Sequence, residues 1–241
     1  MNLRAAPRPS VESTGPGGLS RTGEATIRVL CVDDHESIVD GLRARFHATS
    51  PLRMVGHLNS VERLLEETAR LRPDLVVLDI DLPGPDVFET VDRLRHQHPK
   101  LRLAFLSGHV REGYLVAARK CGANGYFSKS DPIDETIAGL VEVARGTKEF
   151  VPGRSIRERC VAAAGSRRTG SAPSVLESLT PRELEVLRLI GRGRSRREIA
   201  GELCRSPKTI DGHQDRLMRK LGLATRTDLV RFAIREGFAE A

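Results

Sequence analysis

Five polar residues within the first 130 positions of the chain could together bind a cation and a phosphoryl group. Each follows a short apolar segment; they are Asp33, Asp34, Asp79, Ser107 and Lys129. Carboxylate oxygens are the ligands that Mg²⁺ prefers, and a carboxylate can also attack phosphorus as a nucleophile. An ammonium and a hydroxyl would stabilise the charge of the transferred group. Taken alone, Asp79 before Pro83-Gly84 could equally be a turn aspartate that caps its own loop.

The segments before these residues predict the strands of a parallel sheet. Leu75 to Leu78 is a run of four apolar residues, typical of a strand buried on both faces. Similar segments cover residues 27–32, 53–58, 101–106 and 125–128, and helical periodicity separates them at 38–46, 61–71, 87–94, 114–121 and 133–144. This alternation predicts an α/β domain, a doubly wound five-stranded parallel sheet of the flavodoxin-like order 2-1-3-4-5. Because parallel strands end at the same edge, the five polar residues should meet there.

Charge and composition divide the chain of 241 residues into unlike parts. Residues 26–152 hold 17 Lys and Arg against 19 Asp and Glu, whereas residues 175–241 hold 14 against 10, within an overall net charge of +7. We expect a disordered tail at 1–25, a first domain at 26–152, a flexible basic linker at 153–174 and a second domain at 175–241. The basic second domain favours a nucleic-acid partner. Four dispersed cysteines, no signal peptide and no membrane-spanning segment favour a cytoplasmic protein without a membrane partner.

The second domain is predicted to be a small bundle of four helices. Capping signals begin at Thr180, Ser195 and Thr225, and Ser206-Pro207 is a further helix start. The expected helices are 180–191, 195–203, 206–221 and 225–236. The short connection between the second and third helices is typical of a helix-turn-helix.

Residues 26 to about 150 resemble the receiver domain of two-component response regulators. The resemblance lies in Val32-Asp33-Asp34, in Leu78-Asp79-Ile80-Asp81-Leu82-Pro83-Gly84, in Ser107-Gly108 and in Gly125-Tyr126-Phe127-Ser128-Lys129. It implies that Asp79 accepts a phosphoryl group from a sensor histidine kinase. It also implies that Mg²⁺ is held by Asp34, Asp79 and the backbone carbonyl of Asp81, with Asp33 assisting. By the same resemblance Ser107 and Lys129 contact the phosphoryl oxygens, and Tyr126 is the switch aromatic.

The second domain resembles LuxR-type DNA-binding domains, and the combination resembles the NarL/FixJ group of response regulators. The matching segments are Leu179 to Leu187, Arg197-Glu198-Ile199-Ala200, Lys208 to His213 and Arg219-Lys220-Leu221-Gly222. The resemblance implies that helix 206–221 enters the major groove of promoter DNA and that helix 225–236 contributes to a homodimer. The candidate DNA contacts, most of them to phosphates, are Arg205, Lys208, Thr209, His213, Arg216, Arg219 and Lys220. Asp211 and Asp215 on the same helix would repel DNA phosphates, although a carboxylate can also accept a hydrogen bond from N4 of a cytosine.

These features predict a phosphorylation-controlled transcription regulator rather than an enzyme. Two alternatives stay open at this point. The receiver could serve mainly as a phosphorylation-independent interaction module. The DxD of Asp79-Ile80-Asp81 could instead belong to an aspartate-dependent phosphatase, although such hydrolases usually carry this motif on their first strand.

Overall fold

The computed structural model describes residues 26–238, apart from 83–84, 109 and 167–174. The predicted disordered tail at 1–25 therefore lies outside the described residues.

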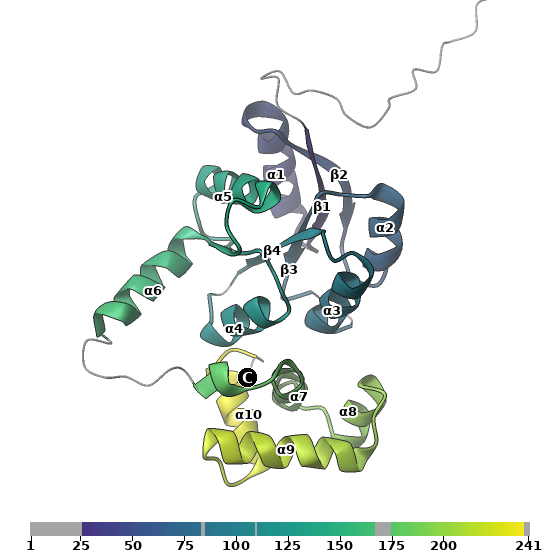
Figure 1. Cartoon of the computed structure of the whole chain (residues 1–241), viewed down its shortest axis with the longest axis vertical. Helices are drawn as coiled ribbons and strands as arrows, with labels where there is room; N and C mark the ends of the chain where they lie inside the picture. The colour runs from purple at the N-terminus through teal and green to yellow at the C-terminus, as the bar shows by residue number, and fades with distance from the viewer. Residues whose placement is uncertain (1–25, 83–84, 109, 167–174, 239–241) are drawn as a thin grey trace, which may run out of the picture.

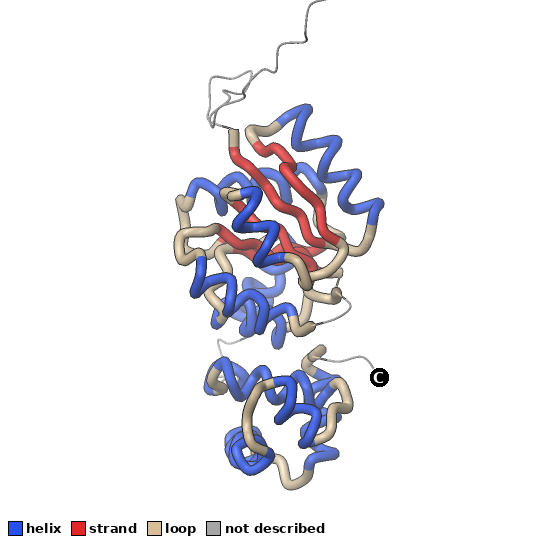
Figure 2. Tube along the Cα trace, turned by 90° about the vertical axis from the view of Figure 1, so that its right-hand side faces the viewer, coloured by secondary structure: helices blue, strands red, loops and turns tan. Residues whose placement is uncertain are grey.

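The first domain is built on one parallel sheet, which Figure 2 shows in red. Its strands are β1 (Ile27–Val32), β2 (Leu52–Leu58), β3 (Leu75–Asp79), β4 (Arg102–Ser107), β5 (Gly125–Ser128) and β6 (Val151–Pro152). They lie in the order β2-β1-β3-β4-β5-β6. The predicted order is confirmed for the first five strands, and the prediction of only five was wrong. A strand of two residues carries no alternating pattern, and β6 is recognisable only by its pairing with β5.

Helices cover both faces of this sheet (Figure 1). They are α1 (Glu36–Thr49), α2 (Leu64–Leu71), α3 (Val87–Gln97), α4 (Glu112–Lys120) and α5 (Ile133–Arg145). Alternate strand residues point to opposite faces. Val29 and Val77 accordingly pack with α1 and α5, whereas Leu30 and Val76 pack with α2, α3 and α4.

The region predicted to be a flexible linker is largely a helix. Helix α6 (Arg154–Ser166) follows β6 directly, so the prediction of flexibility was wrong for residues 154–166. Ile156 is fully buried, and the backbone N–H of Ser155 donates to the Asp131 carboxylate at 3.0 Å. Arg154 also pairs with Glu158 one helical turn later, at 2.8 Å. The first turns of α6 are thus held by receiver side chains.

The second domain is helical throughout its described length apart from its turns. A short 3₁₀ turn η2 (Val175–Ser178) precedes α7 (Pro181–Gly191), α8 (Arg196–Glu202), α9 (Pro207–Leu221) and α10 (Arg226–Arg235). Capping boxes at Thr180, Ser195 and Thr225 begin α7, α8 and α10, and the Ser206 side chain caps α9. Gly222, with φ of 65°, ends α9 in the left-handed conformation that glycine adopts without strain. The four predicted helices are present within two residues of the expected ends.

The two domains touch through α7, which lies beside α3 and α4, while α9 lies on the far side of the second domain (Figure 1). Apolar side chains form one continuous cluster across this contact, from Phe88 and Ala117 in the receiver to Leu184 and Phe238 in the second domain.

Candidate phosphoacceptor site and DNA-binding face

Strand register places the five polar residues at one edge of the sheet. Val32 lies opposite Leu78, so Asp33 and Asp79 follow on neighbouring strands. Asp79 lies opposite Leu106, directly before Ser107. Ser107 lies opposite Ser128, directly before Lys129. The five polar residues therefore lie together at one edge of the sheet, as their positions after the predicted strands indicate.

Lys129 joins the two buried carboxylates of this site. Its ammonium lies 2.8 Å from Asp33 Oδ2 and 2.8 Å from Asp79 Oδ2, and both aspartates are only 1% exposed. Burial raises the pKa of Asp79 above its ordinary value, with Lys129 opposing and Asp33 adding to the rise. Burial alone would lower the pKa of Lys129, but its hydrogen bonds to Asp33 and Asp79 outweigh that effect and raise it. Lys129 is thus a fixed cation beside the Asp79 carboxylate.

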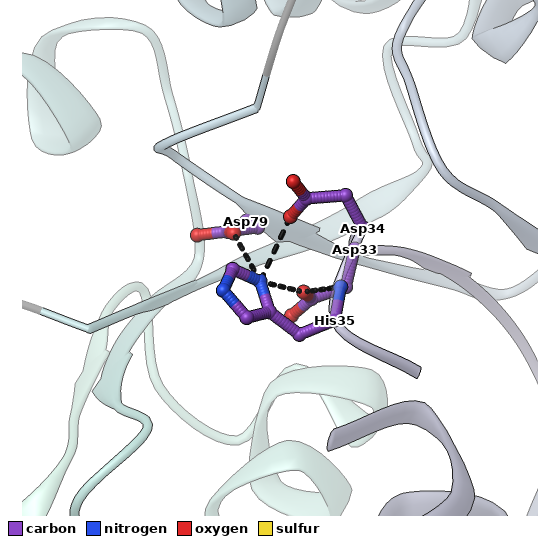
Figure 3. A group of neighbouring side chains, drawn as sticks. All are labelled: Asp33, Asp34, His35 and Asp79. Atoms are coloured by element: carbon purple, nitrogen blue, oxygen red, sulfur yellow. Dashed lines mark hydrogen bonds and ion pairs between the residues drawn. The ribbon is translucent and has the colours of Figure 1, made fainter. Parts of the chain in front are cut away.

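His35 also belongs to this cluster, although the sequence reasoning did not select it. Its Nδ1 lies 2.8 Å from Asp34, 3.1 Å from Asp33 and 3.9 Å from Asp79, between the three carboxylates (Figure 3). The signal was its position directly after Asp33-Asp34 at the same strand end. One atom from each of these four residues lies within 4.8 Å of the others. Three carboxylates are a donor set that suits Mg²⁺, so the residues present fit such an ion.

The remaining predicted site residues surround Asp79. Ser107 and Tyr126 are fully buried, and a hydrogen bond joins their side chains. The backbone N–H of Asp81 donates to Asp79 Oδ1 at 3.2 Å, which fixes the turn after β3. The Asp81 side chain instead accepts a hydrogen bond from the Tyr114 hydroxyl at 3.2 Å. Tyr114 was absent from the sequence-based site because nothing in its local pattern separates it from a core aromatic.

The predicted DNA contacts lie on α9 and the turn before it. All of them are exposed except His213, which is half-buried. Lys220 turns back to its own domain, donating to Glu183 Oε2 at 2.7 Å and to the Ser178 carbonyl at 3.0 Å. Arg216 bonds the half-buried His213 at 2.9 Å. Asp211 is paired with Arg196 of α8 at 3.0 Å, whereas Asp215 is exposed.

The geometry defines a protein that joins a cluster of carboxylates and one lysine, at the edge of a parallel sheet, to a helix-turn-helix. Residues 29–140 match the response regulator receiver domain, and residues 177–233 match the bacterial regulatory proteins of the luxR family. The transcriptional regulatory protein MctR of Rhizobium johnstonii is 32% identical over 90% of this chain and 97% of its own. DevR/DosR of Mycobacterium tuberculosis, a DNA-binding transcriptional activator, is 32% identical over 86% of this chain and 94% of its own.

A similar arrangement of elements occurs in a solved structure of RcsB from Salmonella enterica serovar Typhimurium. It is 23% identical and covers 86% of this chain and 98% of that one, with a TM-score of 0.67. The chain belongs to the response regulators that couple a receiver domain to a LuxR-type helix-turn-helix domain. In the part of the chain that the structure describes, every helix is too short or too polar to cross a bilayer.

Proposed function

We propose that Asp79 accepts a phosphoryl group from a sensor histidine kinase and that this controls promoter binding by the second domain. The observation that carries the proposal is the Asp79 carboxylate itself, buried at a strand end and 2.8 Å from Lys129. One cation would be enough to pair an aspartate with a purely structural role. Asp79 instead shares the edge of the sheet with two further carboxylates, those of Asp33 and Asp34, and with the buried hydroxyl of Ser107.

The chemistry would be a displacement at phosphorus. An Asp79 oxygen forms the new P–O bond as the P–N bond to the kinase histidine breaks, and that nitrogen retains the bonding electrons. Lys129 and Ser107 would bind oxygens of the transferred group, since ammonium and hydroxyl donors stabilise its charge. Asp33, Asp34, Asp79 and the Asp81 carbonyl would hold Mg²⁺, which neutralises negative charge when it is bound.

The second domain would bind double-stranded DNA through α9, as a homodimer in the phosphorylated state. The exposed residues Arg205, Lys208, Thr209 and Arg219 are the foremost candidates for phosphate contacts. His213, Arg216 and Lys220 are assigned to the same face, and there Lys220 must exchange its bond to Glu183 for a phosphate. Helix α10 would supply the dimer contact.

The test is phosphorylation of the full chain by a small phosphodonor such as acetyl phosphate with Mg²⁺. Wild type should gain one acid-stable, base-labile acyl phosphate, and Asp79→Asn should gain none. Asp40→Asn, which removes an exposed carboxylate of α1, is the matched control and should react like wild type. Equal labelling of Asp79→Asn and wild type would refute the assignment.

A further inference from the structure

A buried ion pair fastens the second domain to the receiver. Asp86 and Arg188 are 5% and 3% exposed, and Arg188 Nη2 lies 2.7 Å from Asp86 Oδ1. Asp86 also caps α3, because its Oδ1 accepts the backbone N–H groups of Phe88 and Glu89. The Arg188 guanidinium lies 4.2 Å from the centre of the Phe88 ring. The pair therefore joins the loop after Asp79 directly to α7.

An aromatic contact beside this pair involves the end of the chain. Phe238, which follows α10, is fully buried, and its ring lies on Gly113 of α4. A Cβ on Gly113 would lie only 2.5 Å from that ring. The Phe238 ring also meets Tyr114 edge to face, with centroids 6.1 Å apart and an interplanar angle of 79°. Because residue 113 is a glycine, the Phe238 ring can pack directly against the backbone of α4. We call this contact of Phe238 with Gly113 the Phe238 seat.

Tyr114 connects this seat to the phosphoacceptor site. Its hydroxyl donates to Asp81 Oδ1 at 3.2 Å, and the Asp81 backbone N–H donates to Asp79 Oδ1 at 3.2 Å. A path of two hydrogen bonds and one ring contact therefore connects the Asp79 carboxylate to Phe238 of the second domain. Tyr126, the only other tyrosine of the chain, is buried within the receiver and hydrogen-bonded with Ser107.

We propose that Tyr114 is a positioning residue that couples phosphorylation of Asp79 to undocking of the DNA-binding domain from α4. This inference rests on the proposed function of Asp79. A phosphoryl group adds bulk and negative charge beside Asp81, and its carbonyl is a proposed metal ligand, so the Asp81 turn must rearrange. The Tyr114 hydroxyl then loses its acceptor, and the ring that supports Phe238 is released.

The coupling acts in both directions. If the phosphorylated site disfavours the docked domain, the docked domain disfavours phosphorylation by the same factor. Because α9 already faces away from the receiver in the docked state (Figure 1), docking would restrain the domain through α7 and Phe238 without covering the recognition helix.

The experiment measures amide hydrogen exchange in the full chain, with and without beryllium fluoride and Mg²⁺ as the phosphoryl analogue. Wild type should show faster exchange in α4 and α7 with the analogue, by a factor within the range of about 5 to 150 typical of allosteric couplings. Tyr114→Phe keeps the ring and loses the hydroxyl, so its response should be at least halved. Val161→Ala changes an exposed side chain of α6 outside both sites and should respond like wild type. A Tyr114→Phe response as large as that of wild type would overturn the assignment.

Gly113→Ala tests the Phe238 seat from the receiver side. Alanine is the better helix former, so the change should stabilise α4 itself while its methyl group displaces Phe238. We expect analogue-free Gly113→Ala to match the exchange of analogue-bound wild type in α7. Phe238→Ala should do the same, and unchanged α7 exchange in both variants would overturn the docking contact.

A ¹⁹F spectrum of the same samples separates the two proposals. If wild type shows no resonance of bound beryllium fluoride, the proposed function of Asp79 fails. If the resonance is present and α7 exchange does not change, the function stands and the coupling through Tyr114 is wrong.

Discussion

At the scale of single residues, the first domain carries three carboxylates and one ammonium at the edge of its sheet. The single charge of Lys129 is shared by Asp33 and Asp79, and His35 lies among the same oxygens. These residues are far apart in the sequence, yet most were predictable because each follows a strand of a parallel sheet. His35 and Tyr114 were not, because their roles depend on where their rings turn rather than on where their backbones lie.

Magnesium should stabilise the folded receiver through this cluster. Ligand that binds only the folded state adds about 2.7 kcal/mol when its concentration is a hundred times its dissociation constant. We expect Mg²⁺ to raise the melting temperature of wild type, measured by calorimetry, and to raise that of Asp34→Asn much less. Asp40→Asn should keep the full shift, and equal shifts in all three proteins would argue against a metal at this site.

The exposed Asp215 should weaken binding of α9 to DNA of any sequence. Asp215→Asn removes a negative charge facing phosphates, so the slope of log affinity against log salt should become steeper by up to about one. Fluorescence anisotropy at several salt concentrations measures this slope. Asp134→Asn, an exposed receiver carboxylate, is the control for net charge and should leave the slope unchanged.

At the scale of elements, hydrophobic periodicity and capping residues predicted most strands and helices. The two elements that were missed are β6, which is only two residues long, and α6, which is fixed by tertiary contacts. The four helices of the second domain were predicted because a capping residue marks each beginning. Helix α6 was mistaken for a linker because its flanking Gly, Ser and Arg residues read as flexible. The residues that fix it, Ile156 and Ser155, bind receiver groups that only the fold brings near.

If α6 is part of the receiver, its buried residue should matter to receiver stability. Ile156→Ala should cost about 2–5 kcal/mol of unfolding free energy, as for other large-to-small core changes. Val161→Ala on the same helix is the matched control, since Val161 is 71% exposed, and should change stability by less than about 0.5 kcal/mol. Urea unfolding measures both, and equal costs would show that α6 does not belong to the receiver core.

At the scale of the whole molecule, the decisive contact joins residues 102 positions apart. Asp86 reads in the sequence as a helix cap and Arg188 as one more basic residue of a DNA-binding domain. Neither pattern carries the identity of its partner, because the docking of two domains depends on surfaces that neither domain specifies alone.

The Asp86–Arg188 pair should make stability depend on acidic pH. Burial alone would raise the pKa of Asp86, but Arg188 and Arg192 outweigh it and hold the pKa below its ordinary value of 3.8. The unfolded chain therefore binds the proton more readily, so the stabilisation is present above pH 3.8 and is lost as pH falls through the folded-state pKa. Wild type should exceed Asp86→Asn in unfolding free energy at pH 7, with the difference shrinking toward pH 3. A constant difference across that range would show that the pair contributes nothing through its charge.

The end of α6 also limits how far an undocked DNA-binding domain can travel. Only eight residues separate Ser166 from Val175, and an extended chain covers at most about 3.6 Å per residue. The first residue of the freed domain therefore stays within about 30 Å of the end of α6, which keeps the domain near its own receiver at an effective concentration in the millimolar range. Recapture would then outpace diffusion, so that loss of the phosphoryl group could silence the molecule without any search for a partner.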